Sequence, residues 1–170
     1  MSSPEAPVAE RWPVPRGYDF DETLRFAHTG PGDPTVLRRS GLWVKATRTP
    51  AGPATIRLVR SDTAIDAQLW GPGAAWLRPR VPALLGLEDT PPTLPRGDPL
   101  TRLARSHAGV RLVRAPWPLE VLWACILQQR VAFDDAMSAH RRLVRTFGEP
   151  APGPDPLRLP PDPAALLRVD

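Results

Sequence analysis

The residue types that most often carry chemistry are few and scattered in this chain of 170 residues. Its three histidines, His28, His107 and His140, are far apart, and its single cysteine, Cys125, lies within an apolar run. Zinc and related metals need several histidine, cysteine or acidic ligands brought together. We therefore expect no metal site and no cofactor. One cysteine cannot form an internal disulfide, which favours a reducing, cytoplasmic setting.

The acidic neighbours Asp134 and Asp135 could be considered as an acid–base pair for catalysis. Adjacent helix positions point about 100° apart, however, and the helix dipole explains acidic residues in a first turn more simply. His140 lies on the inner stripe of the same predicted helix, where a packed histidine is more common than a catalytic one. The chain also lacks glycine-rich phosphate-binding loops and the nucleophile motif of hydrolases. The residues themselves therefore predict no catalytic group.

Two helical stripes with a polar bend between them form the clearest pattern in the chain. The first stripe follows Pro118, which suits a first helical turn, and consists of Leu119, Leu122, Trp123, Ile126 and Leu127. The second stripe ends before Gly148 and consists of Ala136, Met137, His140, Leu143, Val144 and Phe147. Between them stands Gln128-Gln129-Arg130-Val131-Ala132, which predicts a bend between two helices.

The composition is basic, with 22 arginine and lysine residues and a formal net charge of +4. Such a charge suits a polyanionic partner through contacts with phosphates. Only one of these residues is lysine, Lys45, and 24 prolines accompany them, so a GC-rich codon bias is an alternative origin. No run approaches the ~18 apolar residues of a membrane helix, and the N-terminus shows no targeting pattern. We expect a cytoplasmic protein without a membrane partner.

The first half of the chain predicts a leader, a short helix and a small sheet. Residues 1–16 contain four prolines and little periodicity, which predicts a flexible leader, and residues 18–27 predict a short helix. Short turns separate three strand-like runs and predict antiparallel pairing: 41–49, 54–60 and 64–70. Their alternation predicts one covered face and one partly open face. Residues 73–87 supply a covering helix, which Pro79 and Pro82 would break or kink.

A change of composition divides this part from the helical part. Residues 89–98 are rich in proline and predict a linker. We therefore predict an N-terminal α+β domain over 17–88 and a helical domain over 99–170. A proline-rich extended loop begins at Pro150, and residues 162–170 resemble the start of a further helix. The apolar residues of that helix need a partner, so we expect a marginally stable fold.

The stretch from Pro118 to Pro150 resembles the opening helices of the helix-hairpin-helix DNA glycosylases, in the 3-methyladenine glycosylase II branch. Six positions carry this resemblance: Ile126, Leu127, Gln129, Phe147, Gly148 and Glu149. The segment from Gly17 to Phe26 is similar to the opening Tyr-Asp-x-x-x-x-Leu-x-Phe of that branch, and the stretch from Pro99 to Leu112 also fits. The resemblance implies an α+β fold class, with a small antiparallel TATA-binding-protein-like domain followed by the first helices of an all-α glycosylase domain.

The family flips a damaged purine out of the duplex, fills the gap with a wedge and cleaves the glycosidic bond with the help of an aspartate. By resemblance, Gln128 and Gln129 lie in the bend that faces the duplex, Arg130 takes the place of the wedge, and Phe26 lines the base pocket. Two alternatives stay open: the glutamines solvate a bend, and Phe26 belongs to the core. Ala132 replaces a serine or threonine that caps the second helix in many members.

The family's Leu-x-Gly-Val/Ile-Gly hairpin and catalytic aspartate do not appear in the sequence, so the helical domain is expected to be incomplete. The resemblance implies the N-terminal part of a DNA glycosylase that excises alkylated purines in base-excision repair. Its partner would be double-stranded DNA with alkylated bases, and we expect no turnover from this chain alone. The alternatives are a non-catalytic DNA-binding module, half of a split glycosylase that assembles with a separate C-terminal half, and a remnant or protein-interaction domain.

Overall fold

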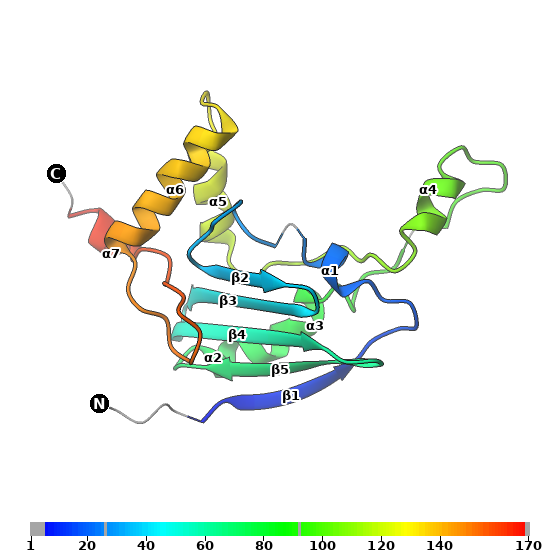
Figure 1. The fold of residues 1–170 in the computed structure, drawn as a ribbon, viewed down its shortest axis with the longest axis horizontal. Coiled ribbons are helices and arrows are strands. Elements are labelled where there is room, and N and C mark those ends of the chain that lie inside the picture. The colour runs from blue at the N-terminus through cyan, green and yellow to red at the C-terminus, as the bar shows by residue number, and fades with distance from the viewer. Residues whose placement is uncertain (1–5, 26, 92, 169–170) are drawn as a thin grey trace.

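A five-stranded antiparallel sheet forms the centre of the molecule (Figure 1). The computed structural model describes residues 6–25, 27–91 and 93–168. The strands lie in the order β1-β5-β4-β3-β2, with these bounds: β1 (Val8–Pro13), β2 (Val36–Arg39), β3 (Leu42–Thr49), β4 (Gly52–Arg60) and β5 (Ala64–Trp70). The three predicted strand runs are confirmed as β3, β4 and β5, and the pattern of the sequence did not reveal β1 or β2.

Strand β1 corrects the prediction of a flexible leader for Val8–Pro13, whereas residues 1–5 of that predicted leader lie outside the described residues. Val8 to Pro13 pair with β5 in continuous antiparallel register, from Val8 opposite Leu69 to Pro13 opposite Ala64. An edge strand tolerates proline because only one of its sides needs N–H donors. Trp12 packs against the core, and Glu10 accepts a hydrogen bond from Arg78 Nε at 2.6 Å. The proline content of this segment therefore concealed a strand.

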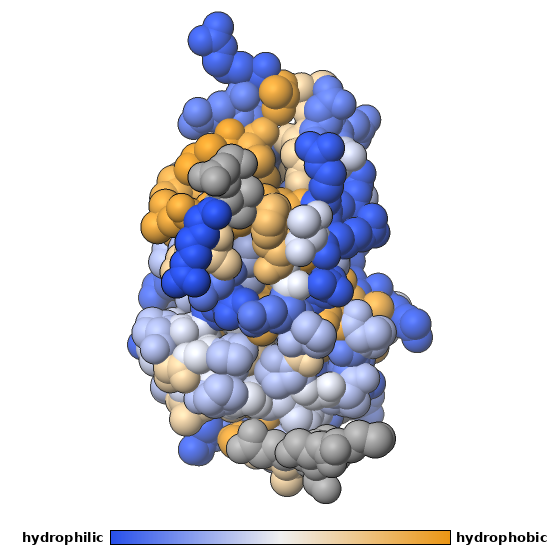
Figure 2. All heavy atoms as spheres, turned by 90° about the vertical axis from the view of Figure 1, so that its left-hand side faces the viewer, coloured by the Kyte–Doolittle hydropathy of each residue, from blue (hydrophilic) through white to orange (hydrophobic). Residues whose placement is uncertain are grey.

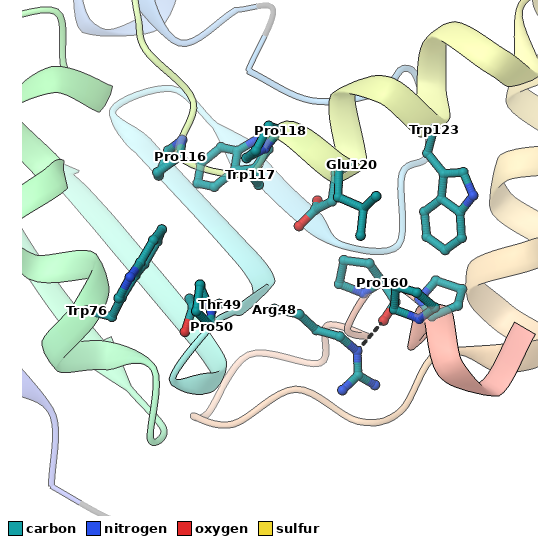
Figure 3. A pocket seen from close by; sticks show the side chains of 13 residues that line it. Arg48, Thr49, Pro50, Trp76, Pro116, Trp117, Pro118, Glu120, Trp123 and Pro160 are labelled. Atoms are coloured by element: carbon teal, nitrogen blue, oxygen red, sulfur yellow. Dashed lines mark hydrogen bonds between the residues drawn. The ribbon is translucent and has the colours of Figure 1, made fainter.

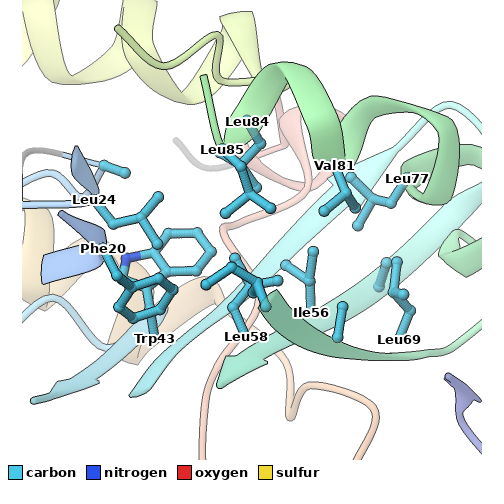
Figure 4. Packing of buried hydrophobic residues seen from close by; sticks show 14 of the residues in the cluster. Phe20, Leu24, Trp43, Ile56, Leu58, Leu69, Leu77, Val81, Leu84 and Leu85 are labelled. Atoms are coloured by element: carbon cyan, nitrogen blue, oxygen red, sulfur yellow. The ribbon is translucent and has the colours of Figure 1, made fainter. Parts of the chain in front are cut away.

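One face of the sheet is covered by short helices that close the main core. They are α1 (Phe20–Thr23), α2 (Ala74–Leu77), a 3-10 turn (Arg78–Arg80) and α3 (Val81–Leu84). Figure 4 shows Leu77, Val81, Leu84 and Leu85 facing Ile56, Leu58 and Leu69 of the sheet. The expected covering helix is thus confirmed, and it is broken into short turns where Pro79 and Pro82 interrupt it.

The second face of the sheet is partly open, as the sequence predicts, with Val59 and Gln68 exposed, but its part on β3 is covered. Leu157 and Leu159, from the proline-rich segment after Pro150, pack against Val44 and Ala46 of β3. Both β3 side chains are 0 % exposed. Strand alternation predicts which residues share a face, but it cannot predict that a segment more than a hundred residues later covers that face.

The remaining helices lie beside the sheet: α4 (Thr101–Ser106), α5 (Pro118–Leu127), α6 (Phe133–Phe147) and α7 (Pro163–Leu166). Both predicted helical stripes are confirmed, as α5 and α6, which stand side by side as a pair (Figure 1). We call them the helix pair. None of the helices in the described ranges is long and apolar enough to span a membrane.

Gly148 ends α6 at a point where the chain has no room for a side chain. A Cβ atom there would overlap the carbonyl oxygens of Val144 and Leu159, both of which are backbone atoms that cannot rotate away. We expect Gly148→Ala to lower the free energy of unfolding by about 2 kcal/mol, measured by urea denaturation. Gly97→Ala is the comparison, because a Cβ atom there meets no other atom within 4 Å and costs only the backbone strain of a φ of 84°, about 1 kcal/mol. An equal or smaller loss for Gly148→Ala would contradict this packing.

Candidate nucleic-acid interface

Gln128, Gln129 and Arg130 lie together in the bend between α5 and α6, as the sequence predicts, and all three are exposed. The bend forms the end of the helix pair that points away from the sheet (Figure 1). The N–H groups of Gln128 and Gln129 donate to Ala124 O and Ile126 O, both at 3.1 Å. These bonds close the last turn of α5 and leave the glutamine amides free to face solvent or a ligand.

Arg130 has a left-handed backbone conformation, with φ at 59°, and among the described residues it is the one non-glycine with positive φ. A side chain in this region strains the backbone, and such strain is most often kept at functional sites. The next helix begins after Ala132, whose methyl group cannot cap it. Asp134 and Asp135 lie in its first turn, where carboxylates interact favourably with the helix dipole.

A cleft of about 230 Å³ separates α5 from the loop that follows residue 26. Gln128 lies at one end of this cleft, and His28 and Thr29 form its other wall. Gln129 and Arg130 are not among its lining residues, so the cleft brings together only part of the predicted site. Phe26, the predicted base-pocket residue, lies outside the described residues.

Lys45 and Glu120 form an ion pair at the floor of the cleft. Lys45 belongs to β3 and is 2 % exposed. Its Nζ donates to Glu120 Oε2 at 2.5 Å and to Thr35 Oγ1 at 2.7 Å, and lies 5.6 Å from the centre of the Trp117 ring. The other Glu120 oxygen accepts a hydrogen bond from Thr47. A buried charge is tolerated only with such partners.

Asp33 and His140 form a second buried pair. His140 Nε2 lies 3.2 Å from Asp33 Oδ1, and Asp33 Oδ1 also accepts from the backbone N and the hydroxyl of Thr35 at 2.9 and 2.8 Å. Burial opposes ionisation of Asp33, but the hydrogen bond from His140 and the charge of Lys45 outweigh it and hold the pKa of Asp33 well below its usual range. The prediction of a packed His140 is confirmed.

Acid should weaken the fold through Asp33. Because the pKa of Asp33 is lower in the folded than in the unfolded chain, the unfolded chain takes up the proton first as the pH falls. The stabilisation is complete above about pH 5 and is lost below the ordinary aspartate pKa of about 3.9. We expect the free energy of unfolding to fall by up to about 1.4 kcal/mol per pH unit more in the wild type than in Asp33→Asn. Urea denaturation of both proteins is measured between about pH 5 and about pH 2.5. If Asp33 were not responsible, the free energy of unfolding would fall equally steeply with pH in the wild type and in Asp33→Asn.

A second, more apolar pocket of about 340 Å³ lies at the N-terminal end of α5. Figure 3 shows Trp76, Trp117 and Trp123 around it, with prolines on both sides. Arg48 donates from Nε to Pro160 O at 2.8 Å and closes its lower edge. Its lining lacks the several histidine or acidic ligands that a metal needs, and no such cluster occurs among the described residues.

Helix α5 exposes an unusual amount of apolar surface. None of its residues, all of which the structure describes, is buried. Leu119, Leu122 and Ile126 are between 52 % and 55 % exposed, although their spacing is that of an inward-facing stripe. Figure 2 views the molecule from the left-hand side of Figure 1 and shows hydrophobic side chains gathered in its upper half, where Figure 1 places the helix pair. A contiguous apolar patch of this kind marks an interaction surface.

The sequence did not reveal the buried polar cluster of Asp33, Thr35, Lys45, Glu120 and His140. These residues are separated by up to 107 positions in the chain and form no short motif. The one available signal was Lys45 itself, because a lysine in a strand between Val44 and Ala46 must face either solvent or a buried acid.

No protein-family model and no curated protein sequence matches this chain. Among solved structures it is similar to the 3-methyladenine DNA glycosylase from Archaeoglobus fulgidus, with a TM-score of 0.70 and 22 % sequence identity. The match covers 94 % of this chain and 58 % of that chain. The chain thus shares its fold with a little more than half of that glycosylase.

Proposed function

We propose that this chain is the N-terminal part of a DNA glycosylase that excises alkylated purines, and that its own contribution is to bind damaged double-stranded DNA. The observation that supports the proposal most strongly is the fold shared with a 3-methyladenine DNA glycosylase. The exposed bend between α5 and α6 adds a polar tip with a strained arginine. In this proposal the bend faces the duplex, and the cleft beside Gln128 lies on the path of the flipped base.

The second part of the proposal concerns the division into domains. We propose an α+β domain over 17–88, a linker over 89–98 and, over 99–170, the first helices of a helix-hairpin-helix domain. The exposed apolar side chains of α5 favour a helical domain that further helices complete, either in the same polypeptide or in a separate C-terminal half. Those helices would also bring the hairpin that grips the phosphate backbone and the catalytic aspartate.

Arg130 offers a direct test of DNA binding, because replacing it should make the fold more stable but DNA binding weaker. Glycine has no strain at a φ of 59°, so we expect Arg130→Gly to raise the free energy of unfolding by up to about 1 kcal/mol. The same change removes a guanidinium that can stack in the gap and meet phosphate, so binding to a duplex with an abasic site should weaken about tenfold.

The matched control is Arg102→Ala, which removes one exposed positive charge from α4 and should leave binding within about twofold. Both variants are compared by fluorescence anisotropy at fixed salt and by urea denaturation. If both variants bound the duplex equally weakly, Arg130 would contribute only its positive charge, as any exposed arginine does.

The enzymatic side of the proposal is tested by release of 3-methyladenine from alkylated duplex DNA. The purified chain should release no base, because the sequence contains no candidate catalytic group and the proposal places that group in the completing helices. Release by the 170-residue chain would overturn this part and would require a catalytic residue within it.

A further inference from the structure

The buried polar cluster connects the sheet to both members of the helix pair. Lys45 of β3 holds Glu120 of α5, and Asp33, in the loop before β2, holds His140 of α6. The Thr35 hydroxyl accepts from Lys45 Nζ at 2.7 Å and donates to Asp33 Oδ1 at 2.8 Å. The two pairs are therefore one continuous network, which we call the joint.

Apolar packing alone gives α5 little support. No residue of this fully described helix is buried, and the buried Trp117, which stacks on Trp43 with ring centroids 6.2 Å apart, precedes the helix. Helix α6 buries Ala136, Met137 and Val144 and has one additional polar anchor, from Arg141 Nη1 to Pro31 O at 2.9 Å. Hydrogen bonds have preferred directions whereas hydrophobic contact does not, and the joint is the hydrogen-bonded network that reaches both helices, so it is suited to fix the angle of the pair.

We propose that the joint positions the Gln128–Arg130 bend by fixing the tilt of the helix pair on the sheet. From Glu120 to Gln128 a helix rises about 12 Å, so a tilt of about 10–20° at the joint would move the bend by about 2–4 Å. A displacement of this size is enough to spoil a DNA contact. Lys45, Glu120, Asp33 and His140 are therefore positioning residues. The consequence for DNA rests on the proposed function, whereas the tilt itself does not.

The test measures the tilt without DNA. Cys125 on α5 is exposed, so spin labels on it and on a second cysteine introduced at the exposed Gln68 of β5 report the distance between helix and sheet by double electron–electron resonance. The first variant is Lys45→Met with Glu120→Leu, which replaces the ion pair by apolar side chains of similar volume. Such replacements often keep a fold stable. The second variant, Asp33→Asn, loosens the α6 side separately.

We expect a narrow distance distribution in the wild type. Because Cys125 lies about 7.5 Å along the helix from Glu120, a tilt of about 10–20° should shift or broaden the distribution in both variants by about 1–3 Å. Ile65→Val is the control, since it removes a methylene from the core on β5, two strands away from Lys45, and should leave the distribution unchanged. Unchanged distributions in both joint variants would overturn the proposal.

A second readout uses the fact that Lys45 is the sole lysine of the chain. Acylation of its amine, followed at that residue by mass spectrometry, should be about tenfold faster in Asp33→Asn than in Ile65→Val, and equal rates would count against the joint.

Binding to a duplex with an abasic site is measured on the same samples. A shifted or broadened distance distribution in the joint variants, together with weaker DNA binding, supports both proposals. The same change in the distance distribution, in a protein whose wild type binds no DNA, supports the joint and overturns the proposed function.

Discussion

Lys45→Met should destabilise the protein more than any other single change considered for this chain. It removes the cation from a Glu120 side chain that is only 14 % exposed and leaves that carboxylate inside the protein without its partner. Breaking a buried pair in this way costs about 3–5 kcal/mol, which is a large share of the 5–15 kcal/mol that typically separates folded from unfolded protein. We expect the melting temperature to fall by about 10 °C, as measured by circular dichroism.

The double variant Lys45→Met with Glu120→Leu distinguishes the cost of an unpaired buried carboxylate from the net contribution of the ion pair to stability. It buries no unpaired charge, so we expect it to recover most of the lost stability. A double variant as unstable as Lys45→Met would show that the apolar replacements do not pack at this site. Full stability of Lys45→Met itself would mean that Glu120 is not held inside the protein.

Replacing the exposed apolar stripe of α5 should weaken self-association of the isolated chain without unfolding it. Leu122→Glu with Ile126→Lys exchanges two half-exposed apolar side chains for an oppositely charged pair at i and i+4, in the favourable order for a helix. We expect the free energy of unfolding to change by less than about 1 kcal/mol. The wild type should associate at high concentration through this patch, and the variant at least about tenfold more weakly, as measured by sedimentation velocity.

The matched control is Leu100→Lys with Leu103→Glu, which changes two residues at the start of α4 that are 56 % and 57 % exposed. If self-association depends on α5, this control should behave as the wild type does. Equal weakening by both double variants would indicate general stickiness, and a monomeric wild type would contradict the proposal that α5 presents an interface.

The sequence predicted those parts of the molecule whose signals are local. The stripes of α5 and α6, the bend at Gln128 to Arg130 and three of the strands follow from periodicity and turn residues, and the structure confirms them. Strand β1 was missed because its prolines outweighed its weak alternation. The cover of the second face by Leu157 and Leu159 was missed because nothing within β3 indicates which distant segment will pack on it.

The candidate site also has a part that the sequence predicts and a part that only the fold creates. The position of the bend was predictable, whereas the strain at Arg130 depends on the path of the chain between two helices. The joint could not be predicted from residues 33, 45, 120 and 140 separately, because each is ordinary until the fold places an acid beside a base in a buried position. The roles of Gln128, Gln129, Arg130 and Phe26 on DNA stay predictions.

The most direct test of the proposed DNA-binding role is the affinity of the unmodified chain for a duplex with one abasic site, compared with the same duplex undamaged, over a range of salt concentrations. We expect tighter binding to the abasic duplex, because the gap can accept the bend, and an affinity that falls as salt rises, because phosphate contacts release counterions. No binding to either duplex would contradict the proposed function. Equal binding to both would remove the damage-recognition role that distinguishes a glycosylase half from a general DNA-binding module.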